Sequence, residues 1–454
     1  MSKGKILIYG FGISGVSAAK TLTAQGMDFC VVDRMNPEKL REIANANGLP
    51  DFKTIDYNHL AFYDFDTIIK SPGIKLDDLL LNEAKENGVR IITDIEYAFG
   101  MRNDIFSIGI TGTNGKTTTT TLLGEMLRRH SKNSLVTGNI GSGIMWDFYN
   151  ADKNAIAAIE LSSFQLQSII DFKVNIAVVT NITPDHIEWH GNLDNYIKSK
   201  LNIFKNQTKQ DKCIINYNDR ILREKENWLN GDVYYFSIKT ADIKGIFIKD
   251  NKIYINVREP EYLCDTTTVF MPGNHNLENA LAASLAAYLT GVDKSLIIDT
   301  LRTFKGVEHR LEFVRQIGGI KFYNDSKGTN TDATIKAIES FSQPINLILG
   351  GYEKGEDFTR LMKYLSPRVR SVSVMGQTKY RIIEAMKSIG FHNYYVAENL
   401  KEAVLKCIEN AKKDDIVLLS PACASWGMYQ NYMERGNEFK AIIKEMGDGD
   451  GDGE

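Results

Sequence analysis

The sequence predicts an α/β protein built from three domains with parallel sheets. Its length of 454 residues suits about three domains of ordinary size. Short apolar runs alternate along the chain with helix-forming segments, which is typical of strand–helix–strand units. Glycine-rich turns follow two of these runs, at residues 10–15 and 112–115. We expect domains at residues 1–102, 103–306 and 307–446, and a disordered acidic tail at residues 447–454.

The composition narrows the class of protein. With 43% hydrophobic and 24% charged residues, the chain has the balance of an ordinary soluble protein. The net charge of −3 leaves no basic surplus for a phosphate backbone, so we expect no nucleic-acid partner. The five cysteines are scattered without a C-x-x-C pair, which indicates reduced thiols. The start of the chain lacks a signal peptide, and no apolar run approaches the roughly 18 residues of a membrane span, so we expect a cytoplasmic protein.

The first domain opens with a Rossmann-like pattern. Residues 6–9 read as a buried strand, G-x-G-x-x-G follows at residues 10–15, and a second strand at residues 29–32 ends on Asp33. This spacing is the dinucleotide fingerprint, in which the turn holds a diphosphate and the acid holds a ribose. A dehydrogenase, a site for a nucleotide-sugar diphosphate, and glycines that only allow close packing all fit this pattern.

The second domain opens with a phosphate-binding loop. An apolar strand at residues 105–110 leads into G-x-x-G-K-T at residues 112–117, and a helix follows to residue 129. Converging N–H groups, a helix N-terminus and Lys116 suit phosphate, and the Thr117 hydroxyl suits Mg²⁺. The full P-loop pattern needs glycine where Ile110 stands, so a turn that merely reverses the chain is the alternative.

Two later strands of this domain end in polar residues. An apolar run at residues 155–161 contains Glu160, which stands where such folds place a Mg²⁺ ligand; an ordinary edge carboxylate is the alternative. The strand at residues 175–180 leads to His186. His186 and His190 could share a helix face, but Pro184 and Gly191 predict a loop and H-E-x-x-H is absent, so we reject a zinc site.

The remaining chain predicts a hairpin and a third sheet. Residues 246–256 read as a hairpin about Asp250-Asn251, and an alanine-rich helix starts near residue 274. From residue 307, four strands end in Gly, Ser, Lys or Thr, which predicts a polar rim that suits oxyanions. The tail at residues 448–454 resembles the start of a calcium loop but lacks its closing glutamate, so we expect no calcium site there.

Several motifs occur together in a familiar order, and the chain resembles the Mur ligases, the ATP-dependent amino-acid-adding enzymes of peptidoglycan precursor synthesis. The resemblance covers the chain apart from its tail, and the short phosphate loop with Ile110 is the form found in this family. The motifs that carry it are G-T-N-G-K-T at 112–117, E-L-S-S-F-Q-L at 160–166, residues 181–186, N-H-N at 274–276, His309-Arg310 and Asp325-Ser326-Lys327.

The two ends of the chain look like the branch of the family that adds D-glutamate to UDP-N-acetylmuramoyl-L-alanine. The stretches 10–15, 71–73, 349–351 and 420–426 match it, whereas D-N-P-R of the diaminopimelate- or lysine-adding branch is absent. Gly427 departs from this pattern, because an acidic residue is usual there. The resemblance implies a Rossmann-like N-terminal domain for the UDP end of the substrate, a P-loop domain for ATP and two Mg²⁺ ions, a Rossmann-like C-terminal domain for the amino acid, and a monomer.

The resemblance also implies roles for individual residues. Catalysis and the metal ions would involve Lys116, Thr117, Glu160, His186 and Lys200, the last as a carbamate. ATP would contact Gly112, Thr113, Asn114, Gly115, Lys116, Thr117, Thr118, Asn279, Arg310 and Asp325. The UDP substrate would contact Ser14, Asp33, Arg34, Gly73 and Asn139. D-glutamate would contact Lys327, Thr329, Lys354, Ser425 and Tyr432.

Other functions account for fewer of these features. Another Mur-type ligase or a folylpolyglutamate-type ligase is the nearest alternative, although the latter lacks the first Rossmann-like domain. An NAD-dependent dehydrogenase explains the first domain but gives no role to Lys116 or to the third domain. A non-catalytic nucleotide switch explains the phosphate loop but not the polar rim.

Overall fold

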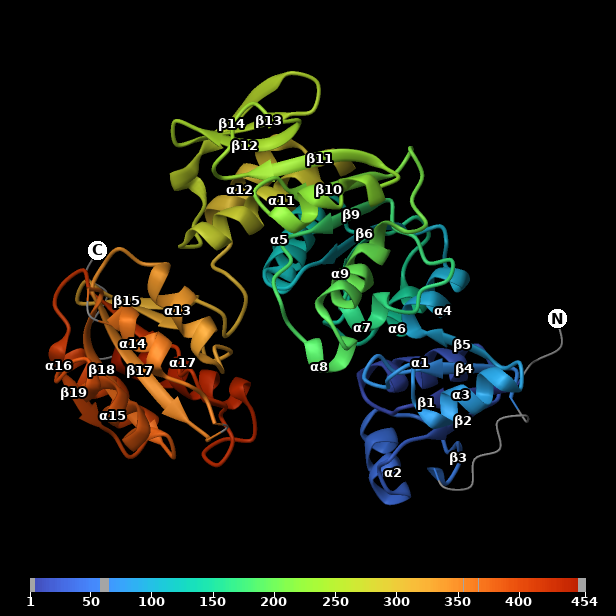
Figure 1. Cartoon of the computed structure of the whole chain (residues 1–454), viewed down its shortest axis with the longest axis horizontal. Helices are drawn as coiled ribbons and strands as arrows, with labels where there is room; N and C mark the ends of the chain where they lie inside the picture. The colour runs from blue at the N-terminus through green and yellow to red at the C-terminus, as the bar shows by residue number, and fades with distance from the viewer. Residues whose placement is uncertain (1–4, 58–64, 354, 366, 448–454) are drawn as a thin grey trace. The chain divides into compact units, whose positions relative to one another are not determined.

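The computed structural model describes the chain except residues 1–4, 58–64, 354, 366 and 448–454. It contains three separate sheets, which confirms the predicted three-domain α/β class (Figure 1). By its contacts the chain divides into two compact units. The first comprises Met1–Val269 and Glu278–Arg302 and holds two sheets, and the second comprises Phe270–Leu277 and Thr303–Glu454 and holds the third. The residue limits of the three domains stay a prediction.

The first sheet has five parallel strands in the order β3-β2-β1-β4-β5. Alternate residues of β1 enter two different apolar clusters, because successive side chains of a strand point to opposite faces. The strand order reverses between β1 and β4, and ligands of such sheets bind beyond this point. The elements are β1 (Ile6–Tyr9), α1 (Ile13–Ala24), β2 (Phe29–Val32), α2 (Pro37–Ala46), β3 (Lys53–Thr54), β4 (Thr67–Lys70), α3 (Leu79–Glu86), β5 (Arg90–Thr93) and α4 (Asp94–Met101).

The second sheet has nine strands in the order β14-β13-β12-β11-β10-β9-β6-β8-β7. Its strands are parallel except at the β12–β13–β14 end. Its strands are β6 (Phe106–Thr111), β7 (Ser134–Gly138), β8 (Ile156–Glu160), β9 (Ile176–Val179), β10 (Lys212–Asn216), β11 (Asp232–Ser237), β12 (Gly245–Lys249), β13 (Lys252–Asn256) and β14 (Pro260–Asp265). The predicted hairpin is confirmed, since β12 and β13 pair around Asp250 and Asn251, both with the positive φ of a tight hairpin turn.

Helices cover this sheet and carry several of the predicted site residues. They are α5 (Lys116–His130), α6 (Ile144–Asn150), α7 (Ser163–Leu166), α8 (Ile187–His190), α9 (Leu193–Leu201), α10 (Arg220–Glu224), α11 (Asn274–Thr290) and α12 (Lys294–Thr303), with short 3₁₀ turns η3 (Asn202–Phe204), η4 (Glu226–Trp228) and η5 (Thr266–Thr268). The predicted loop between Pro184 and Gly191 was wrong in part. One helical turn, α8, forms there, closed by backbone hydrogen bonds from His190 N–H to the His186 carbonyl and from Gly191 N–H to the Ile187 carbonyl, and His186 before it is left-handed (φ 49°).

A buried carboxylate joins the first two sheets inside the first unit. Glu96 of α4 is 4% exposed and accepts the backbone N–H groups of Ile170, Asp171 and Phe172 at 2.6–3.1 Å. Hydrogen bonds from backbone amides to a carboxylate are charge-assisted and strong for their kind. Helix α6 also packs against both α1 and α4. The first domain is therefore tied to the second by buried contacts.

The third sheet has six strands in the order β15-β16-β20-β17-β18-β19 and lies in the second unit. Strands β15 and β16 form an antiparallel hairpin, whereas the others pair in parallel. The ends of β16, β20, β17 and β18 therefore lie along one edge, as predicted for the polar rim. The elements are β15 (Glu312–Ile317), β16 (Ile320–Asn324), α13 (Thr331–Glu339), β17 (Ile345–Gly351), α14 (Thr359–Leu365), β18 (Val369–Gly376), α15 (Lys379–Ser388), β19 (Tyr394–Val396), α16 (Leu400–Asn410), β20 (Ile416–Leu419) and α17 (Tyr432–Gly447).

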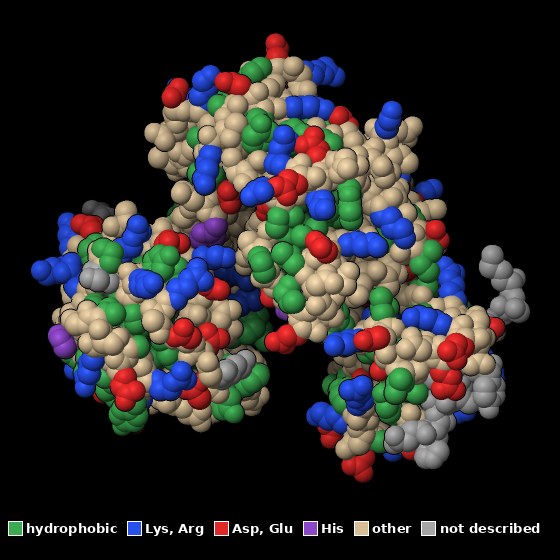
Figure 2. Space-filling model, in the orientation of Figure 1, with side chains coloured by type: hydrophobic (Ala, Val, Ile, Leu, Met, Phe, Trp, Pro, Cys, Tyr) green, Lys and Arg blue, Asp and Glu red, His purple; other side chains and the backbone are tan. Residues whose placement is uncertain are grey.

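The surface and the cysteines agree with the composition. On the face shown in Figure 2, basic and acidic side chains are interspersed over both units. All five cysteines are free thiols; Cys30 is partly buried and the other four are buried. Among the helices that the structure describes, none combines the length and apolar character that a membrane crossing needs.

Candidate active site

The phosphate loop joins β6 to α5 and depends on its glycines. Gly112 and Gly115 have φ angles of 148° and 85°, which residues with a Cβ rarely adopt. A Cβ at Gly115 would collide with the side chain of Asn279, and one at Gly112 with the Thr180 hydroxyl. The Asn279 amide oxygen also accepts a hydrogen bond from Thr119 at 3.3 Å. The structure therefore places Asn279 directly beside the loop, with helix α5 starting at Lys116.

Two lysine side chains meet at one carbonyl group of this loop. Lys116 Nζ donates to the carbonyl oxygens of Gly112 and Thr113, both at 2.9 Å. Lys200 Nζ, from α9, donates to the same Gly112 oxygen at 2.7 Å. Two cations on one acceptor repel each other, so the arrangement favours a neutral amine at one of them or an anion nearby.

Lys200 loses its charge more readily than an ordinary lysine. Its side chain is 2% exposed, and its Nζ lies 4.8 Å from the centre of the Tyr196 ring. Burial, and next the neighbouring Lys116, lower the pKa of Lys200 to about 6. At neutral pH the amine is therefore mostly uncharged, which makes it a nucleophile.

Glu160 ends β8 next to the phosphate loop and has an unsatisfied oxygen. Strand β8 pairs with β6, so that Glu160 lies opposite Ile110. The side chain is 2% exposed; its Oε1 accepts from the Asn139 amide at 2.9 Å, whereas its Oε2 is buried and has no hydrogen-bond partner among the described residues. A buried carboxylate oxygen without a partner is costly, and a divalent cation would satisfy it. Glu160 thus fits a Mg²⁺ ligand.

The other predicted metal ligands lie around the same sheet edge or on the surface. His186 is half exposed, with its Nε2 at 3.5 Å from Asp185 Oδ2 and its ring against Phe164. His190 is buried and lies within hydrogen-bonding distance of Ser163 and Ser199. In the part of the chain that the structure describes, no three His, Cys, Asp or Glu side chains converge as a metal site. The predicted Mg²⁺ ligands include only two such side chains, Glu160 and His186.

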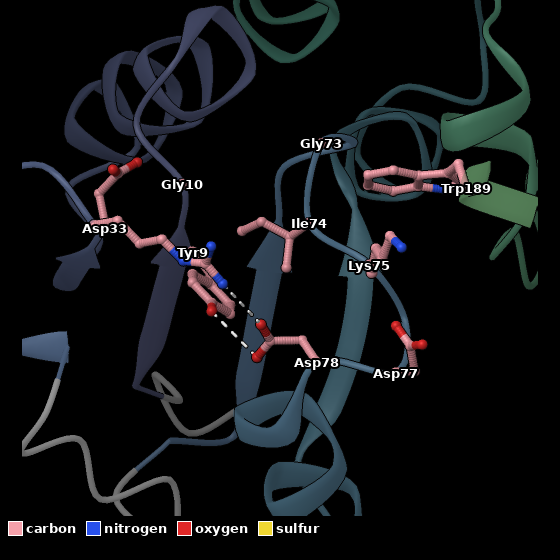
Figure 3. A pocket seen from close by; sticks show the side chains of 10 residues that line it. Tyr9, Gly10, Asp33, Gly73, Ile74, Lys75, Asp77, Asp78 and Trp189 are labelled. Atoms are coloured by element: carbon pink, nitrogen blue, oxygen red, sulfur yellow. Dashed lines mark hydrogen bonds and ion pairs between the residues drawn. The ribbon is translucent and has the colours of Figure 1, made fainter. Parts of the chain in front are cut away.

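A pocket of about 380 Å³ lies at the point where the strand order of the first sheet reverses (Figure 3). Three predicted UDP-substrate residues line it, namely Asp33, Arg34 and Gly73. Gly10 of the predicted glycine-rich turn also lines the pocket, together with residues that sequence reasoning missed: Tyr9, Ile74, Lys75, Asp77, Asp78 and Trp189. The sequence did hold one indication of this lining, because Tyr9 brings a single hydroxyl to the end of an otherwise aliphatic strand.

Asp33 and the two predicted UDP-substrate residues outside the pocket lining, Ser14 and Asn139, have partners inside the protein. Asp33 accepts the backbone N–H groups of Phe11, at 2.6 Å, and Met35, at 2.9 Å, so its carboxylate supports the glycine-rich turn. Ser14 donates to the buried carboxylate of Asp94 at 2.7 Å. Asn139 donates to Glu160, as described above, which places it near the phosphate loop.

A buried lysine lies close to the same turn. Lys70, at the end of β4, is 2% exposed, and its Nζ donates to the Ser71 carbonyl at 3.1 Å. Burial lowers the pKa of Lys70 to about 8, and the nearby Asp94 carboxylate opposes that shift. Burial in turn raises the pKa of Asp94. The first domain therefore has a cation near the turn that can lose its proton.

In the second unit several predicted residues lie on two loops at the polar rim, one after β16 with Asp325, Lys327 and Thr329 and one after β20 with Ser425. Asp325 is buried and accepts from Ser420 Oγ at 2.7 Å, and burial raises its pKa to about 6. Lys327 Nζ lies 5.6 Å from the centre of the Tyr432 ring. Arg310, Thr329 and Ser425 belong to the same unit, whereas Asn279 belongs to the first. Lys354 lies outside the described residues.

Arg435 connects these two loops and was missed by the sequence analysis. It is fully buried in α17 and donates to the Ser326 carbonyl at 2.8 Å and to the Cys423 carbonyl at 3.2 Å. Its Nε also donates to the Ser326 hydroxyl at 3.0 Å. A charged residue within an amphipathic helix usually faces solvent, so the sequence offers no signal for this role.

Models of known protein families match most of the chain. They are a "Mur ligase MurD-like, N-terminal domain" at residues 4–93, a "Mur ligase middle domain" at 110–287 and a "Mur ligase, glutamate ligase domain" at 309–423. Among curated proteins, the UDP-N-acetylmuramoylalanine–D-glutamate ligase of Clostridioides difficile is 41% identical over 97% of this chain and 98% of its own length. The protein of the same name from Caldicellulosiruptor bescii is 42% identical over 98% of each chain.

Solved structures show the same fold. A MurF structure from Acinetobacter baumannii superposes with a TM-score of 0.64 at 16% identity, covering 97% of this chain and 93% of the other. The MurC structure of Thermotoga maritima gives a TM-score of 0.61 at 20% identity, covering 98% of this chain and all of the other. At such identities the likeness concerns the fold alone.

Proposed function

The chain belongs to the Mur ligase family, and within it we propose that this protein joins D-glutamate to UDP-N-acetylmuramoyl-L-alanine at the expense of ATP. The observation that carries the choice of substrates is the identity of about 41%, over nearly the whole chain, with ligases of that name. We place this activity in peptidoglycan precursor synthesis in the cytoplasm and expect a monomer.

The chemistry requires activation of a carboxylate, because the anion is a poor electrophile. Transfer of the γ-phosphate of ATP to the carboxylate of the UDP substrate gives an acyl phosphate. The amine of D-glutamate then attacks its carbonyl carbon, a tetrahedral intermediate forms, and phosphate leaves. Positioning and charge neutralisation supply most of the catalysis in such transfers.

Residues around the phosphate loop suit the first half of this reaction. The loop N–H groups and Lys116 would bind the phosphates of ATP, with Asn279 beside them and Thr118 at the start of α5. Thr117, Glu160, His186 and a modified Lys200 would hold Mg²⁺, which screens the phosphate charges when bound. The partnerless Oε2 of Glu160 supports this assignment.

We propose that Lys200 is carbamylated, and its surroundings support this proposal. The uncharged amine attacks CO₂, a N–C bond forms, and a proton leaves to give a carbamate anion. An ammonium group about 4 Å from Mg²⁺ would instead be repelled by roughly 8 kcal/mol at an effective dielectric constant near 20. Burial of the amine favours the neutral form that this modification needs.

Residues of the second unit suit the amino acid. Lys327, Thr329, Lys354, Ser425 and Tyr432 are proposed to hold the two carboxylates of D-glutamate, and Arg310 and Asp325 to contact the nucleotide. Arg435 supports this arrangement by fixing the loops that carry Lys327 and Ser425. In the first domain, the pocket with Arg34 and Gly73 is the proposed site of the UDP group.

One assay tests the proposal directly. Release of inorganic phosphate from ATP by the purified protein should require both UDP-N-acetylmuramoyl-L-alanine and D-glutamate. A panel with L-lysine, meso-diaminopimelate, L-alanine and L-glutamate in place of D-glutamate decides the amino acid. Release that is independent of the UDP substrate, or that is faster with another amino acid, would contradict the proposed function.

A further inference from the structure

His190 lies where three short helices of the first unit meet. It ends α8, and both α7 and α8 pack against α9, the helix that carries Lys200 (Figure 1). The residue is 4% exposed. Its ring stacks parallel to the Phe164 ring of α7, with 5.7 Å between the ring centres, and meets the Tyr196 ring of α9 at 5.3 Å. A buried polar ring thus lies between the helix that follows Glu160 and the helix of Lys200.

Each ring nitrogen of His190 has one hydroxyl beside it. Nδ1 lies 3.3 Å from Ser199 Oγ of α9, and Nε2 lies 3.1 Å from Ser163 Oγ at the start of α7. Ser163 and Ser199 are buried as well. Both imidazole nitrogens therefore have a hydrogen-bond partner, as a buried polar group requires.

The direction of these two hydrogen bonds follows from Ser199. Its hydroxyl donates to the Asn195 carbonyl at 2.7 Å, and a hydroxyl has one proton, so toward His190 it can only accept. Nδ1 therefore carries the proton of the ring, and Nε2 accepts from the Ser163 hydroxyl. Burial is the main cause that lowers the pKa of His190, which keeps the ring in this neutral form.

The contacts of His190 hold one face of α9. Tyr196 and Ser199 are three residues apart, so they share a face of this helix, and Lys200 follows directly. The Tyr196 hydroxyl lies 2.9 Å from Thr113 Oγ1 of the phosphate loop, and its ring centre lies 4.8 Å from Lys200 Nζ. His190 therefore packs against the same turn of α9 that directs the Lys200 amine to the phosphate loop.

We infer that His190 is a positioning residue of this site, which fixes α9 through its Nδ1–H bond to Ser199 and thereby holds the Lys200 amine beside the phosphate loop. The Ser163 hydroxyl orients the ring for that bond. The inference deepens the proposed function and rests on it, because Lys200 is there a ligand of Mg²⁺. A histidine that only filled space in the core would affect stability but would have no specific link to Lys200.

Two variants that each keep one half of the imidazole separate its two hydrogen bonds. The amide nitrogen of His190→Asn stands near the place of Nδ1 and can still donate to Ser199, whereas the amide of His190→Gln stands near the place of Nε2 and serves only Ser163. We expect kcat to fall about tenfold in His190→Gln and less than about threefold in His190→Asn, because one hydrogen bond then no longer orients the lysine. KM for ATP and for the UDP substrate should stay within about twofold of the wild-type values. The control His130→Gln makes the same exchange at an exposed histidine of α5 and should leave kcat unchanged.

A double-mutant cycle tests whether His190 acts through Lys200. The effect of His190→Gln on kcat is measured in the wild-type chain and in Lys200→Ala, in both cases without added carboxylate. If His190 positions Lys200, this effect should shrink to less than about twofold once the lysine is absent. The same loss in both backgrounds would overturn the inference. So would equal losses in His190→Asn and His190→Gln, since the bond to Ser199 would then have no special part.

The outcome can be told apart from a failure of the proposed reaction. The cycle uses whichever amino acid supports phosphate release, so a preference for an amino acid other than D-glutamate would refute the proposed reaction alone. D-glutamate-dependent release with independent effects of His190→Gln and Lys200→Ala would refute the role of His190 alone. If no amino acid supports release, ¹³C nuclear magnetic resonance of protein equilibrated with ¹³C-bicarbonate is the second readout. The carbamate signal of Lys200 should then be weaker in His190→Gln than in the wild type, and equal signals would overturn the inference.

Discussion

Two glycine-rich turns of this protein have the same outline and different chemistry. Each follows a buried parallel strand and precedes a helix, at residues 10–15 between β1 and α1 and at residues 112–115 between β6 and α5. Carboxylates support the first turn, since Asp33 accepts its Phe11 N–H and Asp94 accepts from Ser14. Lysines converge on the second, where Lys116 and Lys200 share the Gly112 carbonyl. From this contrast we expect the first turn to serve in binding the UDP substrate and the second to serve in phosphate transfer.

Removing the cation of the second turn should have the largest effect. We expect Lys116→Met to lower kcat by at least about 10²–10³-fold, because phosphate charge that develops during transfer loses its counter-charge. UDP binding, which belongs to the first turn, should stay unchanged. Steady-state kinetics measures the fall in kcat, and calorimetry measures UDP binding. The control is Lys132→Met, which removes an exposed lysine. Weakened UDP binding in Lys116→Met would contradict the assignment of UDP binding to the first turn alone.

Removing Lys200 should have the next largest effect, and added carboxylates should restore part of the lost activity. Lys200→Ala leaves a space where a carbamate is proposed, and we expect kcat to fall by about 10²-fold, as for loss of one metal-orienting group. Added formate or acetate should restore part of the lost kcat, because its carboxylate can fill that space. The exposed Lys198→Ala, on the same helix, should behave as wild type. Near-normal activity of Lys200→Ala without added carboxylate would refute the carbamate.

Crowding either turn should separate the two substrates. A Cβ at Gly15 would collide with the Gly10 carbonyl, and one at Gly115 with Asn279. We expect Gly15→Ala to raise KM for the UDP substrate about tenfold and Gly115→Ala to raise KM for ATP by a similar factor, each about 1.4 kcal/mol. The test is the crossed pattern: equal increases in both KM values for either variant would show that the turns are coupled.

The smallest expected effect is a pH dependence confined to the first turn. Lys70 has a pKa lowered to about 8, so it is charged below that pH and loses its proton as the pH rises through it. Loss of this cation leaves Asp94 near the turn, and UDP affinity should fall about threefold between pH 7 and 9. Lys70→Arg should remove the dependence by keeping the charge. A constant UDP affinity in the wild type would show that Lys70 does not act on the diphosphate.

Much of this arrangement could be predicted from local sequence. The order of glycine, lysine and threonine at residues 112–117 describes one continuous loop, and Asp250-Asn251 describes one continuous turn, so neither needs knowledge of distant contacts. The sheets followed from apolar runs. In each case the informative residues are neighbours in the chain.

The rest depends on pairing between distant segments. Asn139 contacts Glu160 only because β7 lies beside β8, and Asp78 meets Tyr9 only because β1 and β4 are adjacent. The burial of Arg435 depends on the packing of α17 against the loops at residues 326 and 423, which the local sequence does not indicate. A motif of neighbouring residues therefore does not indicate which groups of distant segments its side chains contact.

The cysteines have a practical consequence. Cys213 and Cys264 lie in the second sheet, and Cys407 and Cys423 pack within the third. Burial raises the pKa of Cys213 and Cys407 to about 12 and that of Cys423 to about 11, so these thiols are both hidden and protonated while their sheet is intact. An alkylating reagent can react with them only when the surrounding sheet opens. Peptide mass spectrometry after timed alkylation would thus report separately how fast the second and the third sheet open, with no probe introduced into the chain.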